Sequence, residues 1–348
     1  IADVDYLDAI YRDGVLQSYS LSLSGGNDKT RYFISGNYFD QEGIIKSSDY
    51  TRLSSRINID TEVKEWLRTG VNLNISKATT DIIGSSGDGA GGNGGSVIRY
   101  AFFRTPAIPI YQANGEFTDK PSDNYNDDNL YTNLFGDGYS PVGMLAYNNN
   151  KLMNNRLFGK YYVELAPFKD FKFTSNIGID FTTTNQRRFD RNWGTENRIN
   201  NPNRLTVGNG RFQTLTFSNF ATYTKSFNDK HNFNFLLGIE SVEADRYDVV
   251  STESNFPDQT SGLVFLGNGL GQREVDENKS GNSLLSYFAK INYDYEGKYL
   301  VSATIRRDGS SRFGADNRWG NFYAGSLGWR LDKESFLIDN SKIDRLLF

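Results

Sequence analysis

The feature that most constrains this chain is an alternation of apolar and polar residues with a period of two. In residues 299–306, every second side chain is apolar and those between are hydroxyls, a leucine or an arginine. Successive side chains of a β-strand point to opposite faces, so this pattern predicts a strand with one apolar and one polar face. Comparable stretches recur along the chain, and we predict an all-β protein of about eleven antiparallel strands.

The connections between these stretches alternate between short and long. Short ones include 167–170, 226–230 and 296–298, and the long ones are expected at about 78–154, 183–210 and 242–281. Alternate connections of an antiparallel sheet lie at opposite ends, so one end carries tight turns and the other carries loops. This asymmetry is typical of outer-membrane barrels, which have short periplasmic turns and long extracellular loops. A soluble sandwich would have short loops at both ends and remains the alternative fold.

Composition excludes several functional classes. Among 348 residues there are 38 Lys and Arg against 42 Asp and Glu, which disfavours binding to a nucleic-acid backbone. The chain has no cysteine and one histidine, His231, so thiolate sites and most zinc chemistry are excluded. There is no apolar run long enough for a membrane helix, but a barrel strand needs only about 9–11 residues, half of them apolar.

A barrel assigns each predicted face to an environment. The apolar face is expected to contact lipid and carries Leu53, Ile57, Val71, Leu73, Phe173, Ile179, Phe235, Leu237 and Ile291. The polar face is expected to line the lumen and carries Arg52, Arg56, Asn72, Asn74, Asn176, Asn234 and Lys290.

Aromatic residues gather near the ends of the strands that are joined by short turns. Such residues form girdles at the two interfaces of a membrane barrel. The predicted girdle on this side consists of Trp66, Phe168, Tyr295, Tyr299 and Trp329.

Two segments contain weak ligand-binding patterns. Residues 84–95 contain a G-x-G-x-x-G, but neither the amphipathic strand before it nor the sequence after it fits a βαβ unit, so a flexible loop is the better interpretation. Residues 123–129 are rich in Asp and Asn but lack the spacing of a calcium loop. We therefore predict no cofactor, no metal site and no catalytic residue.

The external loops contain residues suited to substrate binding. Residues 185–198 combine four arginines with two aromatic residues, and such a mixture stacks on a sugar or holds a peptide. The alternative is a loop that holds itself together with ion pairs. The predicted substrate-binding residues are Tyr125, Tyr131, Arg191 and Trp193.

Several stretches resemble the TonB-dependent outer-membrane transporters of the SusC/RagA type. They are residues 21–60, 101–111 and 218–240 and, most specifically, 299–337, "YLVSATIRRDGSSRFGADNRWGNFYAGSLGWRLDKESFL". The resemblance covers nearly the whole chain in family order. It implies that residues 1–348 are one β-barrel segment, the first half of a presumed 22-stranded barrel with a plugged lumen.

The resemblance also implies a function and partners. Members of the family import oligosaccharides or peptides across the outer membrane of Gram-negative bacteria, in particular Bacteroidota. A SusD/RagB-like surface lipoprotein acts as a lid, and a TonB complex supplies energy through an N-terminal segment. The resemblance further suggests a dimer of transporter–lipoprotein pairs. The plug domain, the TonB box and the remaining strands are expected outside this chain.

Two other functions are compatible with the sequence. The chain could belong to a structural or docking barrel of a larger envelope assembly, which would lack the plug and TonB box. It could also be a secreted soluble β-protein that binds glycans, which would be released without detergent.

Overall fold

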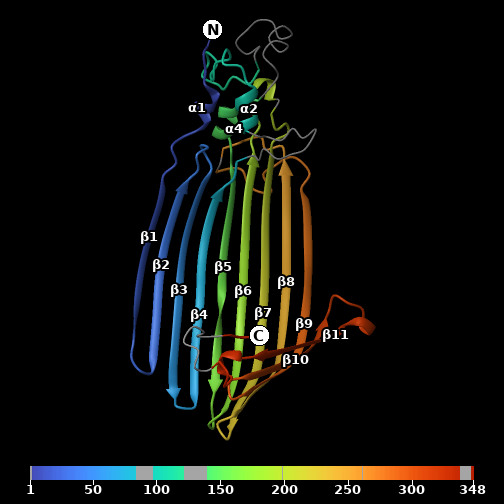
Figure 1. Cartoon of the computed structure of the whole chain (residues 1–348). Coiled ribbons are helices and arrows are strands. Elements are labelled where there is room, and N and C mark those ends of the chain that lie inside the picture. Colours follow the sequence, from blue (N-terminus) through green and yellow to red (C-terminus); the bar gives the residue numbers. More distant parts are fainter. Residues whose placement is uncertain (1, 84–96, 121–138, 198, 261, 338–345) are drawn as a thin grey trace.

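The computed structural model describes residues 2–83, 97–120, 139–197, 199–260, 262–337 and 346–348. These residues form one antiparallel sheet of eleven strands, which pair in chain order from β1 to β11 (Figure 1). The predicted fold class and the number of strands are therefore confirmed. The strands are β1 (Leu16–Gly26), β2 (Thr30–Glu42), β3 (Asp49–Lys64), β4 (Leu67–Asp81), β5 (Asn150–Leu165), β6 (Phe171–Asp190), β7 (Arg204–Phe227), β8 (His231–Ser254), β9 (Glu274–Tyr295), β10 (Tyr299–Ser310) and β11 (Trp319–Trp329).

The helices of the described residues are short. They are α1 (Tyr6–Ile10), α2 (Val97–Phe103) and α4 (Pro141–Ala146), with 3-10 turns η2 (Thr195–Asn197), η3 (Ala315–Asn317) and η4 (Leu331–Lys333). Within the described ranges, none of them has the length and apolar character needed to cross a membrane.

The strands extend further than the sequence pattern predicted. β6 ends at Asp190 and β7 begins at Arg204, so the loop between them is 191–203 rather than 183–210. The loop between β8 and β9 is 255–273 rather than 242–281. In these extensions both faces carry polar residues, so the alternation disappears while the hydrogen-bonded ladder continues.

The register separates the predicted faces completely. In β3 and β4, Arg56 pairs with Asn74 and Ile57 pairs with Leu73. When this alternation is followed through every ladder, all predicted lumen residues lie on one side and all predicted lipid-facing residues on the other. We call these sides the polar face and the apolar face.

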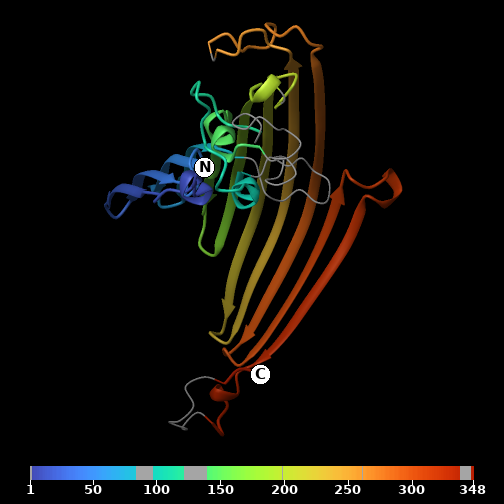
Figure 2. The ribbon, with the colours of Figure 1, turned by 90° about the horizontal axis from the view of Figure 1, so that it is seen from above.

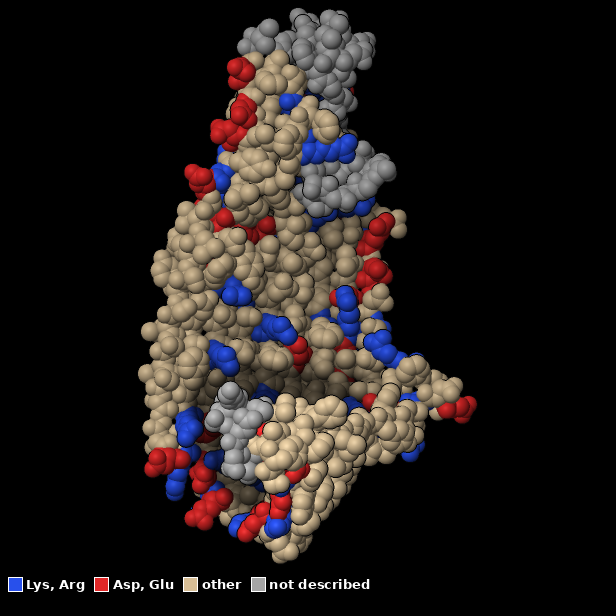
Figure 3. All heavy atoms as spheres, in the orientation of Figure 1, with Lys and Arg blue, Asp and Glu red and all other residues tan. Residues whose placement is uncertain are grey.

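The sheet curls so that the polar face is hollow. Figure 3 shows this hollow, with charged side chains in it, and Figure 2 shows the curved course of the strands from above. Ser286 on the polar face is only 1% exposed, and its hydroxyl accepts a hydrogen bond from Arg306 Nη2 at 2.9 Å. Leu237 and Leu327 on the apolar face are 67% and 82% exposed.

The apolar face carries a band that ends at a definite level toward the long loops. In each of two strands, the last apolar residue before the loop end is followed by a basic residue at the next position on the same face. These pairs are Ile75 and Lys77 in β4, and Ile305 and Arg307 in β10. Through the ladders, however, Ile305 lies level with Leu67 at the other end of β4. The band therefore runs obliquely across the strands, as expected when strands tilt by about 35–45° in a membrane barrel.

Buried apolar residues gather at the loop end of the sheet in two clusters. The first joins α1, α2 and α4, and its buried members are Tyr6, Ile10, Ile45, Val97, Ala101 and Leu145. Within it the Tyr6 hydroxyl donates a hydrogen bond to the Ile108 carbonyl at 2.8 Å and accepts one from Arg104 at 3.0 Å. The second cluster consists of Phe189, Leu205, Phe256 and Val264, and it fixes loop 255–273 to β6 and β7.

Candidate functional site

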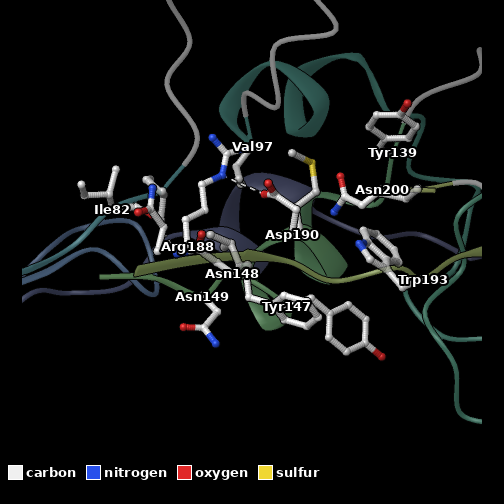
Figure 4. A pocket seen from close by; sticks show the side chains of 16 residues that line it. Ile82, Val97, Tyr139, Tyr147, Asn148, Asn149, Arg188, Asp190, Trp193 and Asn200 are labelled. Atoms are coloured by element: carbon white, nitrogen blue, oxygen red, sulfur yellow. Dashed lines mark hydrogen bonds and ion pairs between the residues drawn. The ribbon is translucent and has the colours of Figure 1, made fainter. Parts of the chain in front are cut away.

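A pocket of about 410 Å³ opens at the loop end, between α4, the end of β6 and loop 191–203 (Figure 4). Its lining combines aromatic rings, aliphatic side chains, asparagine amides and one ion pair. The labelled lining residues in Figure 4 are Ile82, Val97, Tyr139, Tyr147, Asn148, Asn149, Arg188, Asp190, Trp193 and Asn200.

Helix α4 positions one wall of the pocket. Its first residue is Pro141, and the Ser140 hydroxyl caps it by accepting a hydrogen bond from the Gly143 N–H at 3.2 Å. The helix ends at Ala146, and the C-cap residue Tyr147 lines the pocket. Gly143 is required here, because an added Cβ would lie 2.7 Å from the ring of Trp193.

Trp193 forms a packed wall. It is 8% exposed, and its backbone exchanges hydrogen bonds with Ile199 at 3.2 and 3.1 Å across the turn that contains Gly194. The ring centroid lies 5.4 Å from that of Tyr147 and 6.5 Å from that of Phe117. These packed rings make a rigid aromatic surface beside the opening.

Two arginines lie near the pocket: Arg188 lines it, and Arg191 lines an adjoining pocket that shares Tyr147 with it. The exposed Arg191 guanidinium lies 4.8 Å from the centroid of the Tyr147 ring, a cation–π contact. The Arg188 Nε donates to Asp190 Oδ1 at 2.8 Å, so that pair neutralises itself.

Asparagine amides tie the loops together around the opening. Asn148 Nδ2 donates to the Ile82 carbonyl at 2.9 Å, and Asn200 Nδ2 donates to the Arg191 carbonyl at 2.8 Å. An amide has two donor hydrogens and an acceptor oxygen, so it bonds equally well to sugar hydroxyls and to a peptide backbone.

A second pocket of about 740 Å³ adjoins the first and shares Tyr147, Asn148, Asn149 and Phe189 with it. Its lining also includes Arg187 and Arg191 and residues 257–260. The Asn192 N–H donates to Gln259 Oε1 at 2.6 Å, and Gln259 Nε2 donates to the Asn192 carbonyl at 3.2 Å. Loops 191–203 and 255–273 are thus fastened to each other.

Loop 255–273 is also held by a buried carboxylate. The Glu253 side chain, 4% exposed, accepts a hydrogen bond from the Gly267 N–H at 2.5 Å and pairs with Arg273 at 3.1 Å. Glu253 stands at the loop end of β8, beyond the apolar band. Burial by itself would raise the pKa of Glu253, but the hydrogen bonds from Gly267, Arg273 and Gly269 outweigh it, and the pKa lies below its ordinary value.

The structure brings together two of the four predicted substrate-binding residues. Arg191 and Trp193 both contact Tyr147, whereas Tyr125 and Tyr131 lie outside the described residues. The glycine-rich segment 84–95 and segment 123–129 also lie there. Tyr147 and Phe117 were not predicted, because they stand in a long connection without periodicity and gave no signal.

The predicted girdle residues lie near the short turns. Trp66 and Phe168 stand in turns, while Tyr295, Tyr299 and Trp329 stack in a row on the apolar face with centroids 6.2 and 6.4 Å apart. The Tyr299 hydroxyl and Trp329 Nε1 both donate to Glu334 Oε1, at 2.8 and 3.0 Å. Each ring thus has an apolar body on the sheet and a polar tip beyond it, which suits a membrane interface.

Other chemistry is not supported in the described part of the chain. His231 Nδ1 is 2.8 Å from the Tyr293 hydroxyl at a short-turn end, away from the pockets. No group of His, Cys, Asp and Glu residues with the arrangement of a metal site occurs among the described residues.

Comparison with known proteins gives a consistent set of relatives. No protein-family model matches the chain. A TonB-dependent receptor of Formosa agariphila is 30% identical over 344 residues, which is 96% of this chain and 30% of that protein. The TonB-dependent receptor SusC of Bacteroides thetaiotaomicron is 25% identical over 97% of this chain and 33% of its own length.

A solved structure has the same fold. The RagAB peptide transporter matches with a TM-score of 0.79 and 22% identity, over 97% of this chain and 36% of that one. The chain spans about a third of the length of the curated relatives that it matches.

Proposed function

This chain is a segment of a TonB-dependent outer-membrane receptor of the SusC/RagA type, and from that premise we propose that it forms the first half of the barrel of a nutrient importer. The substrates we propose are oligosaccharides or peptides, and the segment itself catalyses no reaction. Import by the whole protein also requires the plug and the other strands of the barrel.

The observation that carries the proposal is the separation of the two faces. An exposed apolar band on the convex side suits contact with lipid, and a polar hollow suits a water-filled passage. The polar face is lined with hydrogen-bonded charges, as where Arg156 meets Asp180 through two bonds of 2.9 and 2.7 Å. Polar solutes such as sugars and peptides cross a membrane only along such a surface.

The two adjoining pockets at the loop end, which share Tyr147, form the proposed entry site. Because the ring of Trp193 is mostly buried, we propose that it supports the site from behind, while Arg191 and the edge of Tyr147 contact the substrate. Tyr125 and Tyr131 lie outside the described residues, and we keep them as proposed substrate-binding residues because they are aromatic residues of a long external loop. An aromatic ring beside a cation and several amides binds sugars and peptides alike, so the site supports both classes.

The proposed partners lie at the two ends of the barrel. A SusD/RagB-like lipoprotein would cover the loop end, and a TonB complex would act from the periplasm on a segment outside this chain. We also propose pairing of two transporter–lipoprotein units. The related RagAB structures are described as peptide importers in open-open and closed-closed states, which supports a lid that opens and closes.

Uptake by cells that carry the full-length protein tests the proposal. Fluorescent oligosaccharides and oligopeptides would be offered to wild-type cells, to cells lacking the gene and to cells treated with a protonophore. We expect uptake of either the oligosaccharides or the oligopeptides to be lost both in cells lacking the gene and in cells treated with the protonophore. If uptake of both classes is unchanged while the protein co-purifies with an envelope assembly, the docking function replaces import.

A matched pair of variants tests the site. Arg191→Gln removes the cation over Tyr147 and should lower uptake at limiting substrate about two- to fivefold, the equivalent of a cation–π contact. Arg312→Gln makes the same change in the exposed loop between β10 and β11 and should leave uptake unchanged. Equal effects of both variants would argue against a binding role for Arg191.

A further inference from the structure

The apolar face contains a furrow just beneath the upper edge of its band. Its volume is about 390 Å³, its surface is apolar, and it crosses β2 to β6. The furrow exists because two small residues interrupt a row of large ones. Gly36 pairs with Ser55, Ser55 pairs with Ile75, and the row continues through Leu157 to Phe181.

The furrow has free space beside Gly36. A Cβ built on Gly36 meets no atom within 4 Å, so a side chain there would enter open space. Leu53, in the next row toward the loop end, forms one side of the furrow and is 61% exposed.

A positive charge stands at the upper rim. Lys77 lines the furrow, follows Ile75 on the apolar face and is the first basic residue above the apolar band in β4. Its side chain is exposed, and within the part of the chain that the structure describes no carboxylate lies at ion-pair distance from it. The ammonium group is therefore available to an anion just above the apolar band.

We propose that this furrow binds one acyl chain of an anionic, phosphate-bearing lipid, with the phosphate on Lys77. The inference rests on the proposed function, because it requires the apolar face to contact the membrane. Lipid tails are as apolar as leucine, so the chain is held by van der Waals fit in the furrow rather than by a hydrophobic driving force. The phosphate–ammonium contact supplies the preference for anionic lipid.

Native mass spectrometry of the full-length protein, stripped of lipid in detergent, tests the site. Phosphatidylglycerol, zwitterionic phosphatidylcholine and inorganic phosphate would be titrated separately. Gly36→Leu and Ser55→Leu fill the furrow and should abolish the tightest phosphatidylglycerol adduct. Gly325→Leu adds the same side chain to the same face in β11, where a Cβ meets only the Ser302 carbonyl at 3.6 Å, and should behave as wild type.

Lys77→Gln tests the headgroup contact. It should weaken phosphatidylglycerol binding about fivefold and leave phosphatidylcholine binding nearly unchanged. Inorganic phosphate should bind no variant appreciably, because it lacks the chain that fills the furrow.

Three results would overturn the proposal. They are an unchanged adduct in both furrow-filling variants, an equal loss in Gly325→Leu, or a Lys77→Gln effect that is the same for both lipids. Each variant would first be shown to shift on boiling in a gel, so that an unfolded barrel is not mistaken for an empty furrow. Loss of the lipid site with intact uptake would leave the import proposal standing.

Discussion

At the scale of single residues, the pocket depends on close contacts between residues far apart in the chain. Gly143 shows this most clearly, because its helix presses against the ring of Trp193. Gly143→Ala would favour the helix by about 1 kcal/mol. The added methyl would meet the ring at 2.7 Å, and overpacking of this kind costs about 1–3 kcal/mol, so the clash should prevail.

The expected result of Gly143→Ala is faster hydrogen exchange in α4 and in loop 191–203. Gly262→Ala is the control, since a Cβ there meets nothing within 4 Å. If the two variants exchange at the same rate, Trp193 does not depend on the glycine.

The two faces can also be tested one residue at a time. Leu237→Arg places a charge in the apolar band and should lower the free energy of unfolding of the full-length barrel in lipid vesicles by about 2–4 kcal/mol. Arg52→Ala removes a polar-face residue whose guanidinium lies 5.7 Å from the Phe39 ring centroid, and should cost less than about 1 kcal/mol. Equal costs in urea titrations would mean that the faces are assigned wrongly.

At the scale of elements, loop 255–273 is fastened by a charge as well as by apolar packing. The pKa of Glu253 lies below its ordinary value near 4.5, so its contribution is complete above that value. It is lost as the pH falls through the lower pKa of the folded protein. Hydrogen exchange in this loop, corrected for its intrinsic pH dependence, should therefore rise in acid, at a pH below the ordinary carboxyl pKa of 4.5.

Glu253→Gln should speed hydrogen exchange in loop 255–273 already at neutral pH. It should also remove the rise in exchange at acidic pH. Glu243→Gln, an exposed position on the same face of β8, serves as the control and should change neither. If the loop of the Glu253→Gln variant still opens in acid to the same extent as in the wild type, the effect belongs to another group.

The strands were predictable from the sequence, and the loop elements were not. Period two marks a strand wherever one face is apolar, so β10 with Val301 and Ile305 was recognised at once. The ends of β6 and β8 lost that signal because both faces are polar there. Trp193 was noticed as an aromatic residue among arginines, but its burial depends on Gly143 and Phe117, which are distant in the chain.

At the scale of the whole molecule, the oblique apolar band places the sheet in a membrane at a tilt. The full-length protein in a detergent extract of outer membranes should therefore migrate differently before and after boiling, as folded barrels do. Its unfolded mass should lie well above the 39.3 kDa of this chain, since the curated relatives are about three times as long. A band that never shifts and needs no detergent would favour a soluble β-protein.

The pairing of every strand with its neighbour in sequence also bears on how the protein folds. Apart from the pairing of β4 with β5 across residues 82–149, each strand can add to the growing sheet through contacts with a strand close to it in the chain, which keeps the entropy lost at each step small. The helical cluster is different, because the bond from Tyr6 to Ile108 joins residues 102 positions apart. The sheet can therefore begin to form from its first hairpins. The helical cluster of α1, α2 and α4 can form only after the connection between β4 and β5, which contains Ile108, is present.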